Sequence, residues 1–192
     1  ESTDTALKGA EEVLERYSKS GNSRLAASAS FRGLNNASDE LIVGLKKLAD
    51  KYGTLLQTHA CFSYSTHDSS LARCGMAEIE RLEHLGVIDE RMLIVHSGWL
   101  EPEEVAILSR RKAALVCAPS SSLHNGYGNF LMGKLPELMA LGVTVGLGSD
   151  HASSGIVDMT QEMRAACCGS AARLRHSFGS AAKSYNSSLP SA

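Results

Sequence analysis

The sequence has no excess of basic residues and no apolar segment long enough to cross a lipid bilayer. Its 192 residues include 19 Lys and Arg against 21 Asp and Glu, so it lacks the positive charge that binds a phosphate backbone. No apolar run approaches the roughly 20 residues of a transmembrane helix. The N-terminal segment has neither the basic start nor the apolar stretch of a signal peptide. We therefore expect a cytoplasmic protein that binds neither nucleic acid nor membrane.

The cysteines do not form a disulfide framework. They are odd in number, contain no C-x-x-C pair and lack the regular spacing of secreted disulfide-rich domains. The sequence predicts that all five are buried thiols: Cys61, Cys74, Cys117, Cys167 and Cys168.

Several well-known catalytic motifs are also absent. There is no GxxxxGK[ST] loop for nucleotide phosphates and no GxSxG turn for a nucleophilic serine. The segment Gly146–His151 begins like a dinucleotide-binding loop but lacks its third glycine. The His-x-Glu and Pro-Cys-x-x-Cys signature of the zinc nucleobase deaminases is missing too. These absences argue against nucleotide phosphate binding, serine hydrolysis and that deaminase fold.

What the sequence does contain is a regular alternation of strand and helix patterns. Short runs rich in Val, Leu and Ile alternate with segments whose apolar residues recur at helical spacing. The predicted strands cover residues 24–31, 54–59, 92–96, 114–118 and 143–148. The predicted helices cover residues 7–17, 38–52, 71–85, 101–112, 135–141 and 157–168, and a Ser/Gly-rich loop follows the fourth strand.

This alternation indicates an α/β fold with a parallel sheet covered by helices. Five strand–helix units fit either part of a (β/α)₈ barrel, which needs about 250 residues, or an open doubly wound sheet. We expect one domain over residues 1–168, followed by a Ser/Ala-rich tail over residues 169–192 that forms a surface extension.

Three polar side chains follow predicted strands. His59 ends the second strand, His96 ends the third, and Asp150 follows the fifth. The carboxyl ends of parallel strands build the active site in this class, so these residues converge if their strands are neighbours. Two imidazoles and a carboxylate can hold a divalent ion such as Zn²⁺, which supports hydrolysis. Singly, each also has a structural interpretation, as a hydrogen-bonded histidine or a helix N-cap.

At these residues the sequence resembles the amidohydrolase superfamily, in the branch of triazine hydrolases and guanine, cytosine and adenosine-type deaminases. Three segments carry the resemblance within a match from about Arg24 to Ala166. Leu93–Glu104 is similar to the family's sixth strand and helix, Cys117–Ser122 to its seventh-strand C-P-x-S segment, and Gly142–Ser154 to the eighth strand and its GVxVGLGTDG turn.

The resemblance implies a partial (β/α)₈ barrel made of strands four to eight, with residues 24–31 as strand four. It makes His59 a metal ligand and Asp150 both a ligand and a proton carrier, and it places His96 against the metal-bound water or the substrate. Residues 120–125, including Ser121 and His124, would line the pocket for a small-molecule substrate. The implied cofactor is a divalent metal, typically zinc. The implied reaction is hydrolysis of a non-peptide carbon–nitrogen bond in a small cyclic substrate.

Two features depart from the family pattern. The family carries a His-x-His pair on its first strand, and no such pair occurs in this sequence. A glutamate usually follows the strand-five histidine by three residues, and here that position is Phe62. Because the chain begins with Glu1, we expect a piece of something longer. A catalytically inactive fragment, or a binding or structural derivative of the fold, therefore remains an alternative.

A partial barrel would leave its first and last strands with an open edge. Unpaired strand edges invite pairing between chains. We therefore also expect homo-oligomers formed through these edges.

Overall fold

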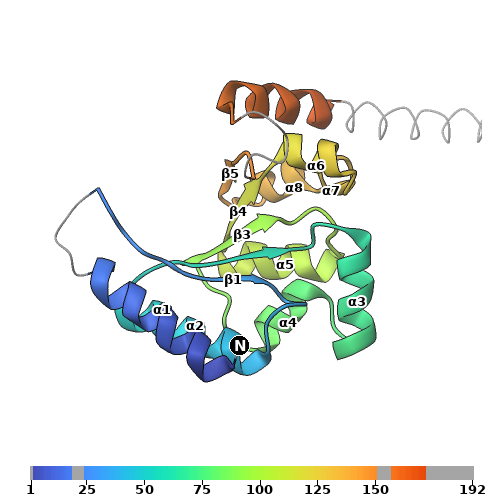
Figure 1. The fold of residues 1–192 in the computed structure, drawn as a ribbon. Helices are drawn as coiled ribbons and strands as arrows, with labels where there is room; N and C mark the ends of the chain where they lie inside the picture. Colours follow the sequence, from blue (N-terminus) through green and yellow to red (C-terminus); the bar gives the residue numbers. More distant parts are fainter. Residues whose placement is uncertain (1, 19–23, 151–156, 172–192) are drawn as a thin grey trace, which may run out of the picture.

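The computed structural model describes residues 2–18, 24–150 and 157–171, and they contain a five-stranded parallel sheet (Figure 1). Every pair of neighbouring strands is parallel, and the strands lie in the order in which they occur along the chain. They are β1 Ala29–Gly33, β2 Leu56–Ala60, β3 Met92–His96, β4 Ala114–Cys117 and β5 Val145–Leu147.

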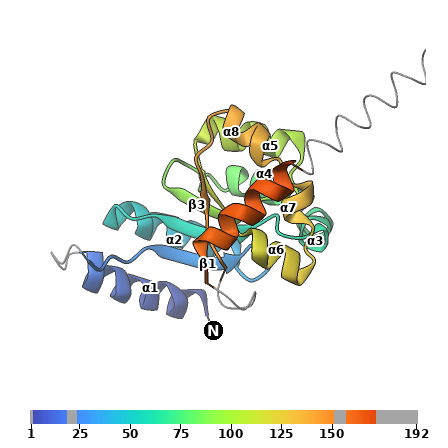
Figure 2. The same cartoon turned by 90° about the horizontal axis from the view of Figure 1, so that it is seen from above.

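Helices precede β1 and connect the successive strands. They are α1 Thr3–Ser18, α2 Asp39–Tyr52, α3 Tyr64–Cys74, α4 Glu78–His84, α5 Pro102–Arg111, α6 Pro119–Asn125, α7 Asn129–Met132 and α8 Leu135–Ala140. A further helix over residues 159–171 lies next to α6 (Figure 2). The predicted α/β fold with a parallel sheet is confirmed.

The strand order decides between the two predicted architectures. A doubly wound sheet reverses its strand order at a switch point, where the ligand binds. The described strands show no such reversal and run β1-β2-β3-β4-β5, as the staves of a (β/α)₈ barrel do. The partial barrel is therefore the correct interpretation, and the doubly wound alternative is wrong.

The hydrophobic core lies between the sheet and the helices that cover one of its faces. Alternate strand residues such as Leu56, Met92, Ile94 and Leu115 point toward the helices and are almost fully buried. They meet helix residues of the same kind, which include Ile42, Leu45, Ile79, Leu82 and Leu108. The opposite alternation leaves residues such as Gln57 and His59 half-buried on the other face of the sheet.

Local sequence signals explain where several elements begin and end. Ser38 caps α2, because its hydroxyl accepts a hydrogen bond from the Leu41 amide, and Gly53 ends that helix in the left-handed conformation. Gly75 ends α3 in the same way with φ of 66°. This glycine divides the segment expected as one helix over residues 71–85 into α3 and α4. Helix α3 starts before the expected residue 71, because Ser63 caps it.

Other predicted boundaries need correction. The first strand covers Ala29–Gly33 and not residues 24–31, since residues 24–28 are mostly exposed and precede the sheet. The loop expected after β4 contains α6 and α7. The last described helix covers residues 159–171 instead of the expected 157–168. The domain boundary at residue 168 stays a prediction, and residues 172–192 of the expected tail lie outside the described part of the chain.

The prediction of buried thiols holds for only part of the set. Cys61 and Cys117 are buried and Cys74 is half-buried, whereas Cys167 and Cys168 are exposed. The last two lie on the helix over residues 159–171, whose outer side meets solvent. All five are free thiols, as expected.

One fully buried carboxylate joins three elements behind the sheet edge. The carboxylate of Glu104, near the start of α5, accepts hydrogen bonds from the backbone amides of Ile79 and Glu101, each at 2.8 Å. The thiol of Cys61, directly after β2, donates to the same carboxylate at 3.8 Å. Burial raises the pKa of Glu104. This side chain therefore fixes the starts of α4 and α5 against the end of β2.

Replacing Glu104 should destabilise the fold. In Glu104→Ala we expect the free energy of unfolding to fall by about 3 kcal/mol, because each buried amide left without a partner costs roughly 1–3 kcal/mol. Urea denaturation followed by circular dichroism measures the change. Glu103→Ala removes an exposed carboxylate from the same helix turn and should shift the stability by less than about 0.5 kcal/mol. Equal losses in the two variants would contradict the anchoring role.

None of the helices in the described part of the chain combines the length and apolar character needed to cross a membrane.

Within the described residues, β1 and β5 are the edge strands of the sheet. Pairing through these edges stays a prediction. Sedimentation equilibrium of the purified chain should show species larger than a monomer, whereas a stable monodisperse monomer would contradict the expectation.

Candidate active site

The side chains of His59, His96 and Asp150 lie together at the carboxyl edge of the sheet. One ligand atom from each lies within 4.8 Å of the others. The register explains the proximity, because Ala60 of β2 pairs with His96 of β3, so the two strands end side by side. Asp150 reaches the same point from the loop that follows β5. The structure thus brings together the three residues that the strand ends suggested.

The orientation of His96 depends on an unusual backbone conformation. Regular alternation would place its side chain on the same face as Met92 and Ile94, which point toward the helices. The backbone of His96 is instead left-handed, with φ of 82°, and its ring centroid lies 5.5 Å from that of His59. The side-chain alternation of β3 therefore breaks at His96, where the two imidazole rings lie next to each other.

Left-handed backbone conformations are concentrated around this site. Within the described residues, four of the five non-glycine residues with positive φ belong to it: Cys61 at 54°, His96 at 82°, Ser97 at 47° and Asp150 at 49°. Such conformations cost roughly 1–3 kcal/mol each and persist where the surroundings impose them, often at functional sites. The backbone amides of Ser97 and Gly98 donate to the carbonyls of Ala60 and Cys61, each at 3.0 Å, which holds the loop in place.

His59 has the environment of an oriented ligand. Its Nδ1 lies 2.7 Å from the carbonyl oxygen of Arg32 at the end of β1. A carbonyl can only accept, so Nδ1 carries the proton and donates, and Nε2 is left with its lone pair. Ligating histidines in metal sites are commonly oriented by such a hydrogen bond from the second ring nitrogen.

His96 is held as a neutral imidazole. It is 6% exposed, and burial lowers its pKa from 6.5 to about 4, with His59 acting in the same direction and Asp150 in the opposite one. Its Nε2 lies 3.7 Å from Oδ2 of Asp150. Its buried Nδ1 has no hydrogen-bond partner in the described part of the chain. A neutral imidazole offers the lone pair that a metal ion or a substrate proton needs.

Asp150 is positioned by α6. The hydroxyl of Ser121 donates to Oδ2 of Asp150 at 2.5 Å. The side-chain amide of Asn125 donates to the Ser121 carbonyl at 3.0 Å and lies 3.2 Å from the Ser121 hydroxyl oxygen. Ser121 was expected to line the substrate pocket, and the structure places it fully buried against Asp150.

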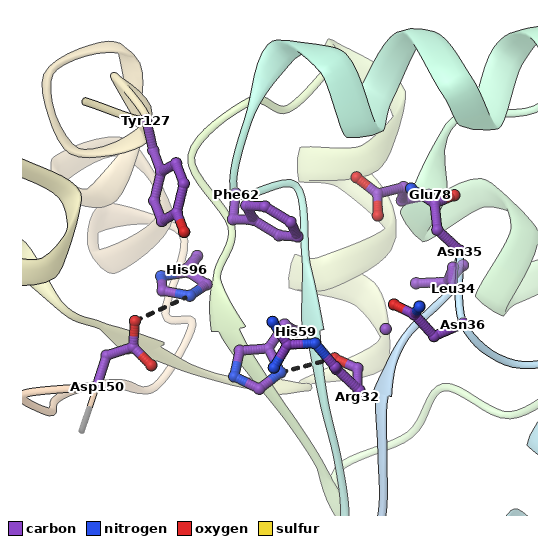
Figure 3. A pocket seen from close by; sticks show the side chains of 11 residues that line it. Arg32, Leu34, Asn35, Asn36, His59, Phe62, Glu78, His96, Tyr127 and Asp150 are labelled. Carbon is purple, nitrogen blue, oxygen red and sulfur yellow. Dashed lines mark hydrogen bonds and ion pairs between the residues drawn. The ribbon is translucent and has the colours of Figure 1, made fainter. Parts of the chain in front are cut away.

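These residues open into a cavity of about 240 Å³ (Figure 3). Its lining combines the three converging residues with aromatic and polar side chains: Arg32, Gly33, Leu34, Asn35, Asn36, His59, Phe62, Glu78, His96, Tyr127 and Asp150. His124 is exposed near the end of α6 and does not belong to this lining. Its role in substrate binding stays a prediction, as do the metal-binding, catalytic and substrate-binding roles expected for His59, His96, Ser121 and Asp150.

Several of these lining residues were not among the site residues predicted from the sequence. Tyr127 lies in a Gly-Tyr-Gly segment between α6 and α7 that carries no recognisable signal. Glu78 opens α4 and reaches the end of β2, where its carboxylate accepts the Cys61 amide at 2.9 Å. Burial raises the pKa of Glu78. Asn35 and Asn36 follow β1 in a turn.

The donor set fits a divalent metal ion. Two imidazole nitrogens and a carboxylate oxygen are ligands that Zn²⁺ accepts. The hydrogen bond from His59 to Arg32 and the hydroxyl of Ser121 on Asp150 supply the outer contacts that usually orient such ligands. A parallel sheet with such a donor set at the carboxyl ends of its strands is typical of barrel-type metallohydrolases.

Comparison with known proteins agrees with this class. The model of the amidohydrolase family matches residues 1–184. The chain therefore belongs to the amidohydrolase family, and the resemblance seen in its sequence is confirmed.

Individual relatives are much longer than this chain. The chain is 28% identical over 130 residues to a 5'-deoxyadenosine deaminase of Methanopyrus kandleri, which covers 67% of this chain and 30% of the relative. Guanine deaminase from C. acetobutylicum, solved with bound guanine, superposes with a TM-score of 0.84 at 24% identity over 93% of this chain and 42% of its own. An adenosine deaminase from Xanthomonas campestris, solved with bound zinc, gives 0.83 at 21% identity over 90% and 38%. Both structures show the shared fold.

Removing the hydroxyl that holds Asp150 should weaken metal binding. In Ser121→Ala we expect the affinity of the chain for Zn²⁺ to fall by about 10-fold or more, since outer contacts of this kind typically contribute 10–100-fold. Competition with a chromogenic chelator measures the affinity. Ser69→Ala, which removes a hydroxyl on α3 that bonds the Ser65 carbonyl, is the control and should leave it unchanged. Equal affinities in all three proteins would show that Ser121 does not support a metal ligand.

Proposed function

We propose that this chain carries part of the active site of a metal-dependent hydrolase that cleaves non-peptide carbon–nitrogen bonds in a small cyclic substrate. The observation that carries the proposal is the convergence of His59, His96 and Asp150 within 4.8 Å beside a cavity. That convergence occurs in a chain of the amidohydrolase family. The named activities of its relatives, deamination of 5'-deoxyadenosine and of guanine, support this substrate class.

The proposed cofactor is a divalent metal, with zinc favoured. Zinc is bound in the related adenosine deaminase structure, and an imidazole nitrogen and a carboxylate oxygen are both ligands that zinc accepts. His59 and Asp150 are the proposed ligands. When bound, the ion would lower the pKa of a coordinated water and so provide a nucleophile near neutral pH.

The chain's own residues would perform the remaining tasks. The carboxylate of Asp150 is proposed to take a proton from the attacking water and to deliver it to the leaving group. The Ser121 hydroxyl keeps one of its oxygens fixed. His96, buried between His59 and Asp150, is proposed to hydrogen-bond the substrate atom on which negative charge develops. The catalytic residues are then His96 and Asp150.

A catalytically inactive derivative of the fold is the second candidate. Phe62 occupies the position where the resemblance places a glutamate, and the chain has no His-x-His pair. With few protein donors, zinc would bind weakly. Elemental analysis of the purified chain discriminates between the candidates, because about one tightly held metal ion per chain would contradict the inactive alternative.

The proposed reaction predicts a metal requirement and a requirement for Asp150. Release of ammonia from 5'-deoxyadenosine or guanine should need added Zn²⁺, should stop after chelation, and should fall by at least about 100-fold in Asp150→Asn, which lacks the ionised carboxylate. Asp158→Asn removes an exposed carboxylate outside the cavity and is the matched control. Undiminished activity without metal would contradict the proposal. The small-molecule partner is part of this proposal, while the cytoplasmic location stays a prediction.

A further inference from the structure

The ring of Phe62 forms part of the cavity wall. Its centroid lies 5.8 Å from that of His96 and 5.3 Å from that of Tyr127, and the latter pair is arranged edge to face (Figure 3). The rings of His96 and Tyr127 are 6.1 Å apart. Three aromatic rings thus lie together on one side of the cavity. We call Phe62, His96 and Tyr127 the aromatic wall.

Tyr127 is held in place from behind. The indole N–H of Trp99 donates to the Tyr127 carbonyl at 2.9 Å. The next residue is Gly128, with φ of 71°, and a Cβ there would lie 3.1 Å from the Trp99 ring. The contact therefore requires glycine at this turn. The backbone that carries Tyr127 is thus fixed, which reduces the entropy lost when a ligand packs against this part of the wall.

The other side of the cavity is polar. Asn35 and Asn36 line it with side-chain amides (Figure 3), and Arg32 also belongs to the lining. Aromatic rings favour offset or edge-to-face contact with another ring, whereas amides and guanidinium groups hydrogen-bond polar edges. A planar ring with polar groups on its rim is complementary to both sides at once.

The presence of Phe62 in the aromatic wall also limits the number of carboxylates that face the cavity. The described lining contains two, Asp150 and Glu78. Glu78 already accepts the backbone amide of Cys61, which fixes its carboxylate at the end of β2. A carboxylate at position 62 would be a third, and Phe62 provides an uncharged stacking face in its place.

We propose that Phe62 is a specificity-determining residue of this site, whose ring stacks on the planar heteroaromatic ring of the ligand while Tyr127 contacts the edge of that ring. The inference rests on the proposed function in that it takes the cavity as the substrate site. It goes further by assigning ring recognition to a residue at the position where the family resemblance places a glutamate.

Uracil and 5,6-dihydrouracil are suitable probes, because they share their carbonyl and N–H groups while only uracil is aromatic. Equilibrium dialysis against the full chain measures both affinities. The single tryptophan, Trp99, contacts Tyr127 and reports binding at the wall by its fluorescence. We expect uracil to bind about tenfold more tightly than dihydrouracil, in keeping with the strength of base–aromatic stacking.

Variants at position 62 separate stacking from cavity shape. Phe62→Leu keeps an apolar side chain of similar bulk and should abolish the preference for uracil, as should Phe62→Glu. Phe62→Tyr keeps the ring and should retain the preference. Tyr17→Leu makes an aromatic-to-aliphatic change on α1, outside the cavity lining, and should also retain it. Circular dichroism of each variant verifies that it is folded.

Equal affinities for the two compounds, no measurable binding of uracil, or a preference that survives in folded Phe62→Leu would each overturn the proposal. Zinc content, measured on the same samples, tests the proposed function separately. A chain that prefers uracil but holds no metal would refute the metal-dependent function and support the aromatic wall. A chain that holds zinc but shows no preference for uracil would refute the aromatic-wall proposal and support the metal-dependent function.

Discussion

The register of the parallel strands is the constraint on which the site depends. Because β2 and β3 pair with Ala60 opposite His96, their carboxyl ends finish level, and the loops that follow them start from the same edge. The buried carboxylate of Glu104 then ties the residue after β2 to the starts of α4 and α5. Sheet register and this anchor together fix the backbone that carries both histidines.

A left-handed backbone at His96 and Asp150 is unfavourable by itself, and the surrounding core offsets it. The strands beneath are packed against the helices through almost fully buried Leu56, Met92 and Ile94. Burial also keeps His96 neutral, because a charged imidazole would lose its hydration there. The same packing that stabilises the sheet therefore prepares the donor set for a cation or a substrate.

The sequence was sufficient to predict features that depend on local periodicity. Strand β3 covers the expected residues 92–96, and the helix that begins after Ser38 ends at Gly53, because alternation and capping residues are local signals. The amidohydrolase resemblance and the partial barrel follow from motifs in fixed order. The left-handed turn at His96 and the aromatic contact of Tyr127 could not be predicted, since each arises from contacts between elements distant in sequence.

His96 belongs to the aromatic wall and also lies beside both proposed metal ligands, and this position has a thermodynamic consequence. Its ring centroid lies 5.5 Å from that of His59 and 5.8 Å from that of Phe62. An ion held by His59 and Asp150 would fix two groups beside this ring, and a ligand packed against the aromatic wall would contact the ring itself. Binding free energies coupled through one group are reciprocal. Whatever zinc adds to the affinity for a planar ligand, that ligand must add to the affinity for zinc.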